Sequence, residues 1–385
     1  MARMMQKDVP IVHVGPAYPY RGGIAQFTTL TARAMQDAGH PPMLCTFQRQ
    51  YPRWLFPGRT QTVEHDAPPA DLPRPERRID TLNPWTWHRT AQWMRSGAYS
   101  GAIFQYWMPF MAPPFGWMAR RMRAAGYPAV AVVHNALPHE RHWGDAWLTR
   151  WFLNSVDGAV ALSEAVEADI RQLAPHLPVR HVPHPTYTQF GTGPTRAEAR
   201  AHLNLPENTP VALFFGFVRR YKGLDVLLNA WPAVQQTHPD AHLMIAGEAY
   251  DDPAPYRAQM LACPRPTQVH WSNQYIPDDE VATYFAAADV VVQPYRHATQ
   301  SGVVRIAAHA NRPVIVTNVG GLAGSVDPGR TGFVVPPDDA EALAQAVETA
   351  FERRTTLQGP HNSSAPEQTL AQALSDLLHA AEGRG

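Results

Sequence analysis

The chain has 385 residues, which suits two domains of ordinary size better than a single hydrophobic core. Its 33 lysines and arginines balance its 33 aspartates and glutamates, which argues against nucleic acid as a partner. The two cysteines, Cys45 and Cys263, have no partner spacing, which argues against a disulfide framework or a zinc site and favours a cytoplasmic compartment. Any bound anion must therefore be held by a local cluster of cations.

Short apolar runs alternate with helical patterns along the whole chain. The first series of predicted strands lies at 10–15, 42–47, 101–106, 128–134, 158–162 and 179–184. The second series lies at 210–216, 241–247, 268–272, 289–295, 312–317 and 331–335. Near-continuous apolar strands are typical of parallel sheets covered on both faces. The sequence therefore predicts an α/β protein with two doubly wound, Rossmann-like domains.

The domain boundary is expected near residue 195, within a segment rich in Gly, Pro, Thr and Asn. This gives an N-terminal domain at 1–195, a second domain at 196–360 and a C-terminal helix at 361–385. One face of that helix carries Leu370, Leu374, Leu377 and Leu378. We expect this face to bury against the N-terminal domain or against its own sheet.

Two helix starts have the spacing of a capping box, in which a short polar side chain and an acid three residues later bond free N–H groups. The pairs are Asp338 with Glu341 and Ser364 with Glu367.

Residues 48–125 are rich in aromatics and prolines. One interpretation is a large but ordinary core. The other is a contact surface for an apolar acceptor or a membrane interface, since Trp and Tyr suit places with one apolar and one wet side. No stretch approaches the roughly 20 apolar residues of a membrane span, and the amino terminus lacks the apolar core of a signal peptide, so we expect a soluble protein or one resting on a membrane surface.

The stretch "GFVRRYKGLDVLLNAW" at 216–231 places cations between a strand and a helix. The strand ends at Gly216, and an i, i+3, i+4, i+7 stripe predicts a helix from near Gly223. Arg219 and Lys222 then lie at a helix N-terminus, where free N–H groups and the helix dipole favour an anion such as a diphosphate. The alternative is that they are solvated surface cations.

Two other strand ends carry candidate binding residues. Gly22 and Gly23 follow the first strand, and paired glycines let the backbone approach a ligand, although the pattern is not GxGxxG and could be a simple turn. His134 follows the strand at 128–134 and could bond a sugar hydroxyl or stabilise charge; the alternative is a satisfied, buried histidine.

Metal binding is not expected. His181 and His184 have HxxH spacing, but Pro183 and Pro185 break any helix there and no third ligand is evident. The adjacent acids Asp251 and Asp252 lie in a predicted open loop and are expected to face solvent.

The chain resembles the family four retaining glycosyltransferases of the GT-B fold over nearly its whole length. The motifs are "GGIAQFTTLTARAM", "VHNALPHE", "FFGFVRRYKGLDVLLNAW" and "ADVVVQPYRHATQSG". The resemblance implies two Rossmann-like domains facing across a cleft and a nucleotide diphosphate sugar as donor. It implies His134, Arg219 and Lys222 as catalytic residues. The implied donor-binding residues are Gly22, Gly23, Gly216, Arg219, Lys222, Thr299, Gln300, Ser301, Gly302 and Val303.

The sequence departs from that family at several acidic positions. Two glutamates separated by seven residues are usual, and Ala298 and Ile306 stand in their places. Ala323 and Gly324 also replace a usual Pro-Glu pair. We interpret this as a variant branch in which the "ATQSGV" loop binds the donor through backbone and hydroxyl groups.

The resemblance implies transfer of a hexose, with retention of anomeric configuration, to a hydroxyl of a polysaccharide, a glycolipid or another glycoconjugate. No cofactor or metal is expected, and a peripheral contact with the inner face of the membrane is a further expectation. Two alternatives stay open, a non-catalytic sugar-nucleotide-binding or assembly subunit and a GT-B nucleotide-sugar epimerase.

Overall fold

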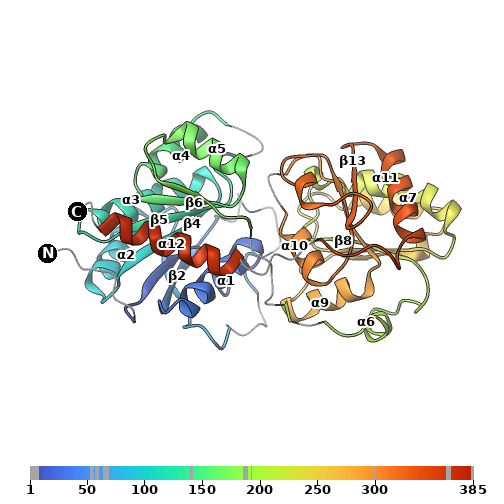
Figure 1. The fold of residues 1–385 in the computed structure, drawn as a ribbon, viewed down its shortest axis with the longest axis horizontal. Coiled ribbons are helices and arrows are strands. Elements are labelled where there is room, and N and C mark those ends of the chain that lie inside the picture. The colour runs from blue at the N-terminus through green and yellow to red at the C-terminus, as the bar shows by residue number, and fades with distance from the viewer. Residues whose placement is uncertain are drawn as a thin grey trace. The chain divides into compact units, whose positions relative to one another are not determined.

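The computed structural model describes residues 8–52, 56, 60–63, 69–138, 142–184, 190–191, 193–298, 301–360 and 366–382. The chain forms two compact units (Figure 1). The first unit is Met1–Pro185 with Ser364–Gly385, and the second is Thr186–Ser363. The predicted boundary near residue 195 therefore lies inside the second unit, at the cap of helix α6 (Arg196–His202), where Thr195 and Glu198 form a capping box.

The first unit is built on seven parallel strands in the order β3-β2-β1-β4-β5-β6-β7. The strands are β1 Ile11–Val14, β2 Pro42–Arg49, β3 Glu76–Asp80, β4 Gly101–Tyr106, β5 Ala129–Val133, β6 Gly158–Ala161 and β7 Val179–His181. The helices are α1 Gly23–Asp37, α2 Pro84–Ser96, α3 Ala112–Arg123, α4 Asp145–Leu153, α5 Glu164–Leu173 and α12 Pro366–Glu382, with a short 3-10 helix η1 at Pro109–Met111. All six strands predicted for this half are confirmed, and β3 is an additional edge strand.

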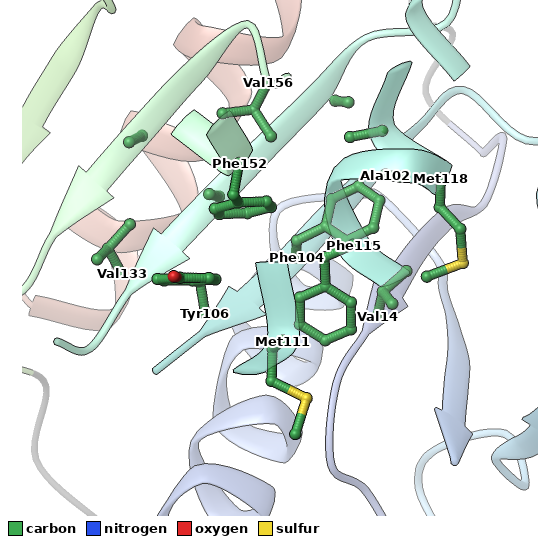
Figure 2. Close-up of a cluster of buried hydrophobic side chains, with 14 of the residues drawn as sticks. Val14, Ala102, Phe104, Tyr106, Met111, Phe115, Met118, Val133, Phe152 and Val156 are labelled. Atoms are coloured by element: carbon green, nitrogen blue, oxygen red, sulfur yellow. The ribbon is translucent and has the colours of Figure 1, made fainter. Parts of the chain in front are cut away.

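One face of this sheet carries an aromatic core (Figure 2). Tyr106 stacks on Phe152 of α4 with ring centroids 4.3 Å apart, and Phe115 of α3 lies in the same cluster. Met111 and Met118, from the aromatic-rich stretch, are also fully buried. The core interpretation of that stretch is thus correct for these residues.

The opposite face of the sheet is covered by α1 and α12. Figure 1 shows α12 lying across the first unit beside α1. Leu377 and Leu378 of α12 sit over two glycines of the sheet, because an added Cβ at Gly158 would lie 2.8 Å from Leu377 and one at Gly101 would lie 3.2 Å from Leu378. The predicted leucine face of the C-terminal helix is confirmed as buried.

The second unit has six parallel strands in the order β10-β9-β8-β11-β12-β13. The strands are β8 Val211–Phe215, β9 His242–Ala246, β10 Val269–Ser272, β11 Val290–Gln293, β12 Val314–Thr317 and β13 Gly332–Val335. The helices after α6 are α7 Leu224–Thr237, α8 Ala254–Ala262, α9 Asp278–Ala287, α10 Gly302–His309 and α11 Ala340–Glu352. All six predicted strands are confirmed.

The start of α11 corrects one sequence prediction. The cap is Asp339, whose side chain accepts from the backbone N–H of Ala342. Asp338, the predicted cap, has a positive φ of 57° and its carboxylate instead pairs with Arg296 at 2.6 Å. The other predicted cap, Ser364, lies outside the described residues.

Candidate functional site

The strand order of the second unit reverses between β8 and β11, and ligands of open parallel sheets bind beyond the strand ends at such a reversal. The segments that follow these strands, 216–223 and 294–298, are in direct contact. The backbone N–H of Arg296 donates to the carbonyl of Tyr221 at 2.7 Å. Gly223, with φ of 68°, packs so closely on Pro294 that a Cβ there would collide with the Pro294 carbonyl. The two segments therefore form one surface.

Three of the predicted donor-binding residues come together on this surface. Gly216 has φ of 102°, and a Cβ added to it would lie 2.9 Å from Nζ of Lys222 and 3.8 Å from Cγ2 of Val303. Nζ of Lys222 also lies 5.4 Å from the centroid of the Tyr295 ring. The absence of a side chain at Gly216 thus leaves room for the lysine ammonium beside the start of α10.

Lys222 makes no ion pair with any residue that the structure describes. Burial, and second the nearby Arg219, lower its pKa to about 7. The Arg219 guanidinium lies 4.7 Å from the centroid of the Tyr250 ring. An ammonium crowded by a second cation and lacking a carboxylate partner is a strong site for an anionic ligand, whose charge would raise that pKa again.

The conformation of the 216–223 segment is fixed by groups that the sequence did not single out. Arg296 bonds both carboxylate oxygens of Asp225, at 2.8 and 2.7 Å, and donates to the carbonyl of Arg220 at 2.7 Å. The ion pair with Asp225 is the main reason that the pKa of Arg296 is raised. Asp251 accepts from the backbone N–H of Arg220 at 2.6 Å, so this exposed acid, expected only to face solvent, also holds the segment.

The start of α10 presents the second candidate ligand surface of this unit. Ser301 is the N-cap, and its hydroxyl accepts from the backbone N–H of Val303 at 3.2 Å. Gly302 is the first helical residue, and helix N-termini favour anions. Thr299 and Gln300 lie outside the described residues. Ala298 and Ile306 are buried, and their apolar side chains offer neither a carboxylate nor another hydrogen-bonding group.

In the first unit the strand order reverses between β1 and β4. Gly22 caps α1 with φ of 104°, and a Cβ at Gly23 would meet no atom within 4 Å, so the backbone of this turn is accessible. Gly15, just after β1, packs against Gln105 of β4, where an added Cβ would lie 2.8 Å from the Gln105 Cβ.

His134 follows β5 and is half-buried. Its Nε2 lies 2.8 Å from Oε1 of Gln105, and its ring meets that of Phe27 of α1 edge to face, with centroids 4.7 Å apart. Burial, with a smaller contribution from His184, lowers the His134 pKa to about 3. A ring with this pKa is neutral in the free protein at physiological pH.

Two findings concern metals and membranes. Over the described ranges, no three residues among His, Cys, Asp and Glu gather into a set that could hold a metal ion. Within the same part of the chain, no helix combines the length and apolarity needed to cross a membrane.

Two parallel sheets, each reversing its order beside a glycine turn and a helix start, define an α/β protein of the GT-B fold. Two family models match this chain, Glycosyltransferase Family 4 over residues 21–190 and Glycosyl transferases group 1 over residues 209–353. The chain is therefore similar to glycosyltransferases over the two ranges that these models match.

Curated glycosyltransferases are also similar in sequence to this chain. A D-inositol 3-phosphate glycosyltransferase of Streptomyces scabiei is 29% identical over 69% of this chain and 62% of the relative. A protein of the same name from Pseudarthrobacter chlorophenolicus is 30% identical over 52% of this chain and 50% of the relative. The chain thus spans between about half and three fifths of the length of these relatives.

Solved structures show the same fold. Sucrose-phosphate synthase from Thermosynechococcus elongatus matches with a TM-score of 0.70 and 21% identity, over 98% of both chains. Anabaena Alr3699/HepE in complex with UDP-glucose matches with a TM-score of 0.68 and 16% identity, also over 98% of both chains.

Proposed function

We propose that this protein is a glycosyltransferase that moves a hexose from a nucleotide diphosphate sugar to an acceptor hydroxyl with retention of anomeric configuration. The observation that carries the proposal is Lys222, an ammonium without an ion-pair partner in the described structure, placed beside Gly216 and Val303 at the strand reversal of the second unit. A diphosphate is the ligand whose charge and size suit Lys222, Arg219 and the start of α10 together.

The reaction that we propose needs no covalent enzyme nucleophile. The acceptor hydroxyl forms a bond to the anomeric carbon on the face from which the diphosphate leaves. The bond from that carbon to the phosphate oxygen breaks, and the leaving phosphate takes the hydroxyl proton. Arg219 and Lys222 stabilise the charge that grows on the diphosphate, a role that preorganised cations fill well in a water-poor site.

Backbone and hydroxyl groups complete the proposed donor site. At the start of α10 we assign the backbone N–H of Gly302 and the hydroxyl of Ser301 to a phosphate or sugar, while the N–H of Val303 donates to Ser301 Oγ. Thr299 and Gln300 are assigned to the same loop from the sequence. In the first unit, the candidate ligand-binding groups are the turn at Gly22 and Gly23 and the ring of His134.

We propose a hexose donor and an acceptor that is a polysaccharide, a glycolipid or another glycoconjugate of the cell envelope. The curated relatives are named for transfer to a phosphorylated polyol, and Alr3699/HepE binds UDP-glucose. We also propose that the enzyme works in the cytoplasm without a metal, since Arg219 and Lys222 supply the positive charge. Full activity in excess EDTA is the expected result, and a loss that Mg²⁺ or Mn²⁺ restores would contradict metal independence.

A peripheral membrane contact is part of the proposal. Trp143 and Trp147 near the start of α4 are 103% and 65% exposed, and Trp117 of the adjacent α3 is 37% exposed, with the Arg121 guanidinium 4.8 Å from its ring centroid. Exposed Trp beside Arg suits a membrane interface. Co-sedimentation with anionic lipid vesicles should fall in the double variant Trp143→Ala, Trp147→Ala; equal sedimentation of both proteins would contradict the contact.

A second candidate function is a non-catalytic sugar-nucleotide-binding subunit, which the apolar side chains of Ala298 and Ile306 favour. The deciding experiment incubates the protein with UDP-, GDP- and ADP-hexoses and a panel of polyol, glycan and glycolipid acceptors. Release of nucleotide diphosphate together with a sugar-bearing acceptor supports transfer. Binding without release would favour the subunit, and conversion of one nucleotide sugar into another would favour an epimerase.

A further inference from the structure

A chain of hydrogen-bonded side chains runs from α1 through β4 to His134. The hydroxyl of Thr31 on α1 donates to the carbonyl of Phe27 at 2.8 Å. The Gln105 amide donates through Nε2 to Oγ1 of Thr31 at 3.2 Å. Oε1 of Gln105 then lies 2.8 Å from Nε2 of His134. Thr31 and Gln105 are both fully buried, so bulk water does not compete for these groups.

The order of donors along this chain determines which nitrogen of His134 carries the proton. The single hydroxyl proton of Thr31 is used on the Phe27 carbonyl, so the Thr31 oxygen can only accept from Gln105. The NH₂ group of Gln105 therefore faces Thr31, and its carbonyl oxygen faces His134. Because that oxygen only accepts, Nε2 of His134 must be the N–H donor, and Nδ1 of the neutral ring is an acceptor.

The residues around the His134 ring hold its orientation and, within the described structure, leave Nδ1 as a free acceptor. Its edge-to-face contact with Phe27, at an interplanar angle of 85°, restricts rotation of the imidazole. Nδ1 has no hydrogen-bond partner among the residues that the structure describes, and the side chain is only partly buried. A lone pair without a protein partner on a neutral ring favours a ligand hydroxyl, whereas a phosphate oxygen has no proton to give.

We propose that Gln105, held by Thr31, is a positioning residue that fixes His134 in the Nε2–H tautomer, so that Nδ1 accepts a hydrogen bond from a sugar hydroxyl. This inference rests on the proposed function, since it takes a sugar as the ligand. It assigns His134 to the hydroxyl groups of the substrate and leaves the phosphates to the cations of the second unit.

Long-range ¹H–¹⁵N NMR spectra of protein labelled at histidine read the tautomer directly, with His134 assigned by its absence from the spectrum of His134→Ala. The wild type should show the Nε2–H pattern, and the matched control Thr31→Ser should keep it because the hydroxyl remains. Gln105→Met, which removes the acceptor, and Thr31→Val, which frees the amide, should give a mixture of tautomers. An Nδ1–H pattern in the wild type, or a Gln105→Met pattern identical to the wild type, would overturn the proposal.

Ligand binding tests whether Nδ1 of His134 accepts a hydrogen bond from a sugar hydroxyl. Addition of UDP-glucose, GDP-mannose and ADP-glucose in turn should shift the Nδ1 resonance with at least one of them, whereas UDP, GDP and ADP should not. An Nδ1 resonance that none of the sugars moves would overturn the hydroxyl contact.

Kinetics separate positioning from a merely structural role. In Gln105→Met and Thr31→Val, kcat should fall about tenfold, the effect of losing one hydrogen bond, while the KM for the donor changes little and Thr31→Ser stays near wild type. A lower melting temperature with unchanged kcat would contradict the positioning role. If the wild type transfers no sugar, the proposed function fails, but the tautomer measurement still decides whether Gln105 sets the proton of His134.

Discussion

The two candidate ligand surfaces of this protein are held in place by different forces. The 216–223 segment of the second unit is fixed by ions: Arg296 spans two aspartates and the backbone of the segment, which leaves Lys222 without an ion-pair partner in the described structure. His134 in the first unit is fixed by neutral hydrogen bonds and by the edge of Phe27. Under the proposed function, the second unit would stabilise charge and the first unit would position hydroxyl groups.

The largest expected effect is the loss of Lys222. Lys222→Ala should lower kcat for sugar transfer about a hundredfold or more, as expected for removal of one charge-stabilising contact in a transition state. The matched control is Arg220→Ala in the same segment, because Arg220 is exposed and its backbone, not its side chain, makes the bonds that fix the loop. Equal losses of kcat in the two variants would show that Lys222 has no special role. They would also contradict the contrast between the two candidate ligand surfaces.

Next in size is the loss of Arg296. Arg296→Ala leaves Asp225 without its bidentate partner and releases the carbonyl of Arg220. We expect the donor KM to rise about tenfold and the free energy of unfolding to fall by about 2 kcal/mol, since hydrogen bonds to charged groups contribute about this much. Urea denaturation and initial-rate kinetics measure both quantities.

The control for that variant is Arg171→Ala, which removes an exposed ion pair with Glu167 on α5. Surface pairs of this kind contribute about 0.5 kcal/mol or less. If Arg296→Ala changes the donor KM and the free energy of unfolding no more than Arg171→Ala does, the ion pairs of Arg296 do not hold the 216–223 segment.

Gly216→Ala should have a smaller effect on stability and a clear effect on activity. The methyl group would stand 2.9 Å from Nζ of Lys222, and the φ of 102° disfavours any side chain. We expect a loss of about 1 kcal/mol in stability and about tenfold in kcat/KM. Gly324→Ala is the control, because no atom lies within 4 Å of its added Cβ. Wild-type kcat/KM in Gly216→Ala would show that the ammonium does not need its present position.

The smallest effect is a pH dependence of donor binding. The pKa of Lys222 is lowered to about 7 in the free protein, and a bound diphosphate would raise it, so binding takes up a proton above that pH. Affinity for a nucleotide sugar should therefore be highest below about pH 7 and fall a few-fold per unit as pH rises. Isothermal titration measures this, with Lys222→Arg as the control whose affinity should not follow pH, because Arg stays protonated.

The lowered pKa of Lys222 also makes the stability of the folded protein depend on pH. Stability rises with pH, whereas donor affinity falls. The unfolded chain binds a proton at Lys222 up to its ordinary pKa near 10.5, whereas the folded chain loses that proton near pH 7. The cost of burying the ammonium is therefore fully present below about pH 7. It is relieved as pH rises between these two values.

Strand positions could be predicted because twelve strands are apolar runs bounded by turn residues. The edge strand β3, with the sequence ERRID, escaped prediction because four of its five side chains are charged, as is common where a sheet ends. Gly216, Lys222 and Val303 could be selected because residues that follow adjacent parallel strands meet at one edge.

Pairings between distant residues could not be predicted in this way. Nothing local in the sequence links Arg296 to Asp225 or to Asp338, since these ion pairs depend on the approach of two loops after folding. Gln105 did leave a signal, because it is a polar residue within the buried strand GAIFQY, but its partners Thr31 and His134 come from other elements. The tautomer of His134 follows only from those contacts.

The most direct test of the account is a thermal-shift panel of UDP-, GDP- and ADP-hexoses on wild type, Lys222→Ala and Arg220→Ala. A ligand that binds only the folded state raises the melting temperature. The account predicts a rise with one nucleotide class that is kept in Arg220→Ala and lost in Lys222→Ala. No rise with any nucleotide sugar, or an equal rise in Lys222→Ala and wild type, would contradict the assignment of Lys222 to a donor diphosphate.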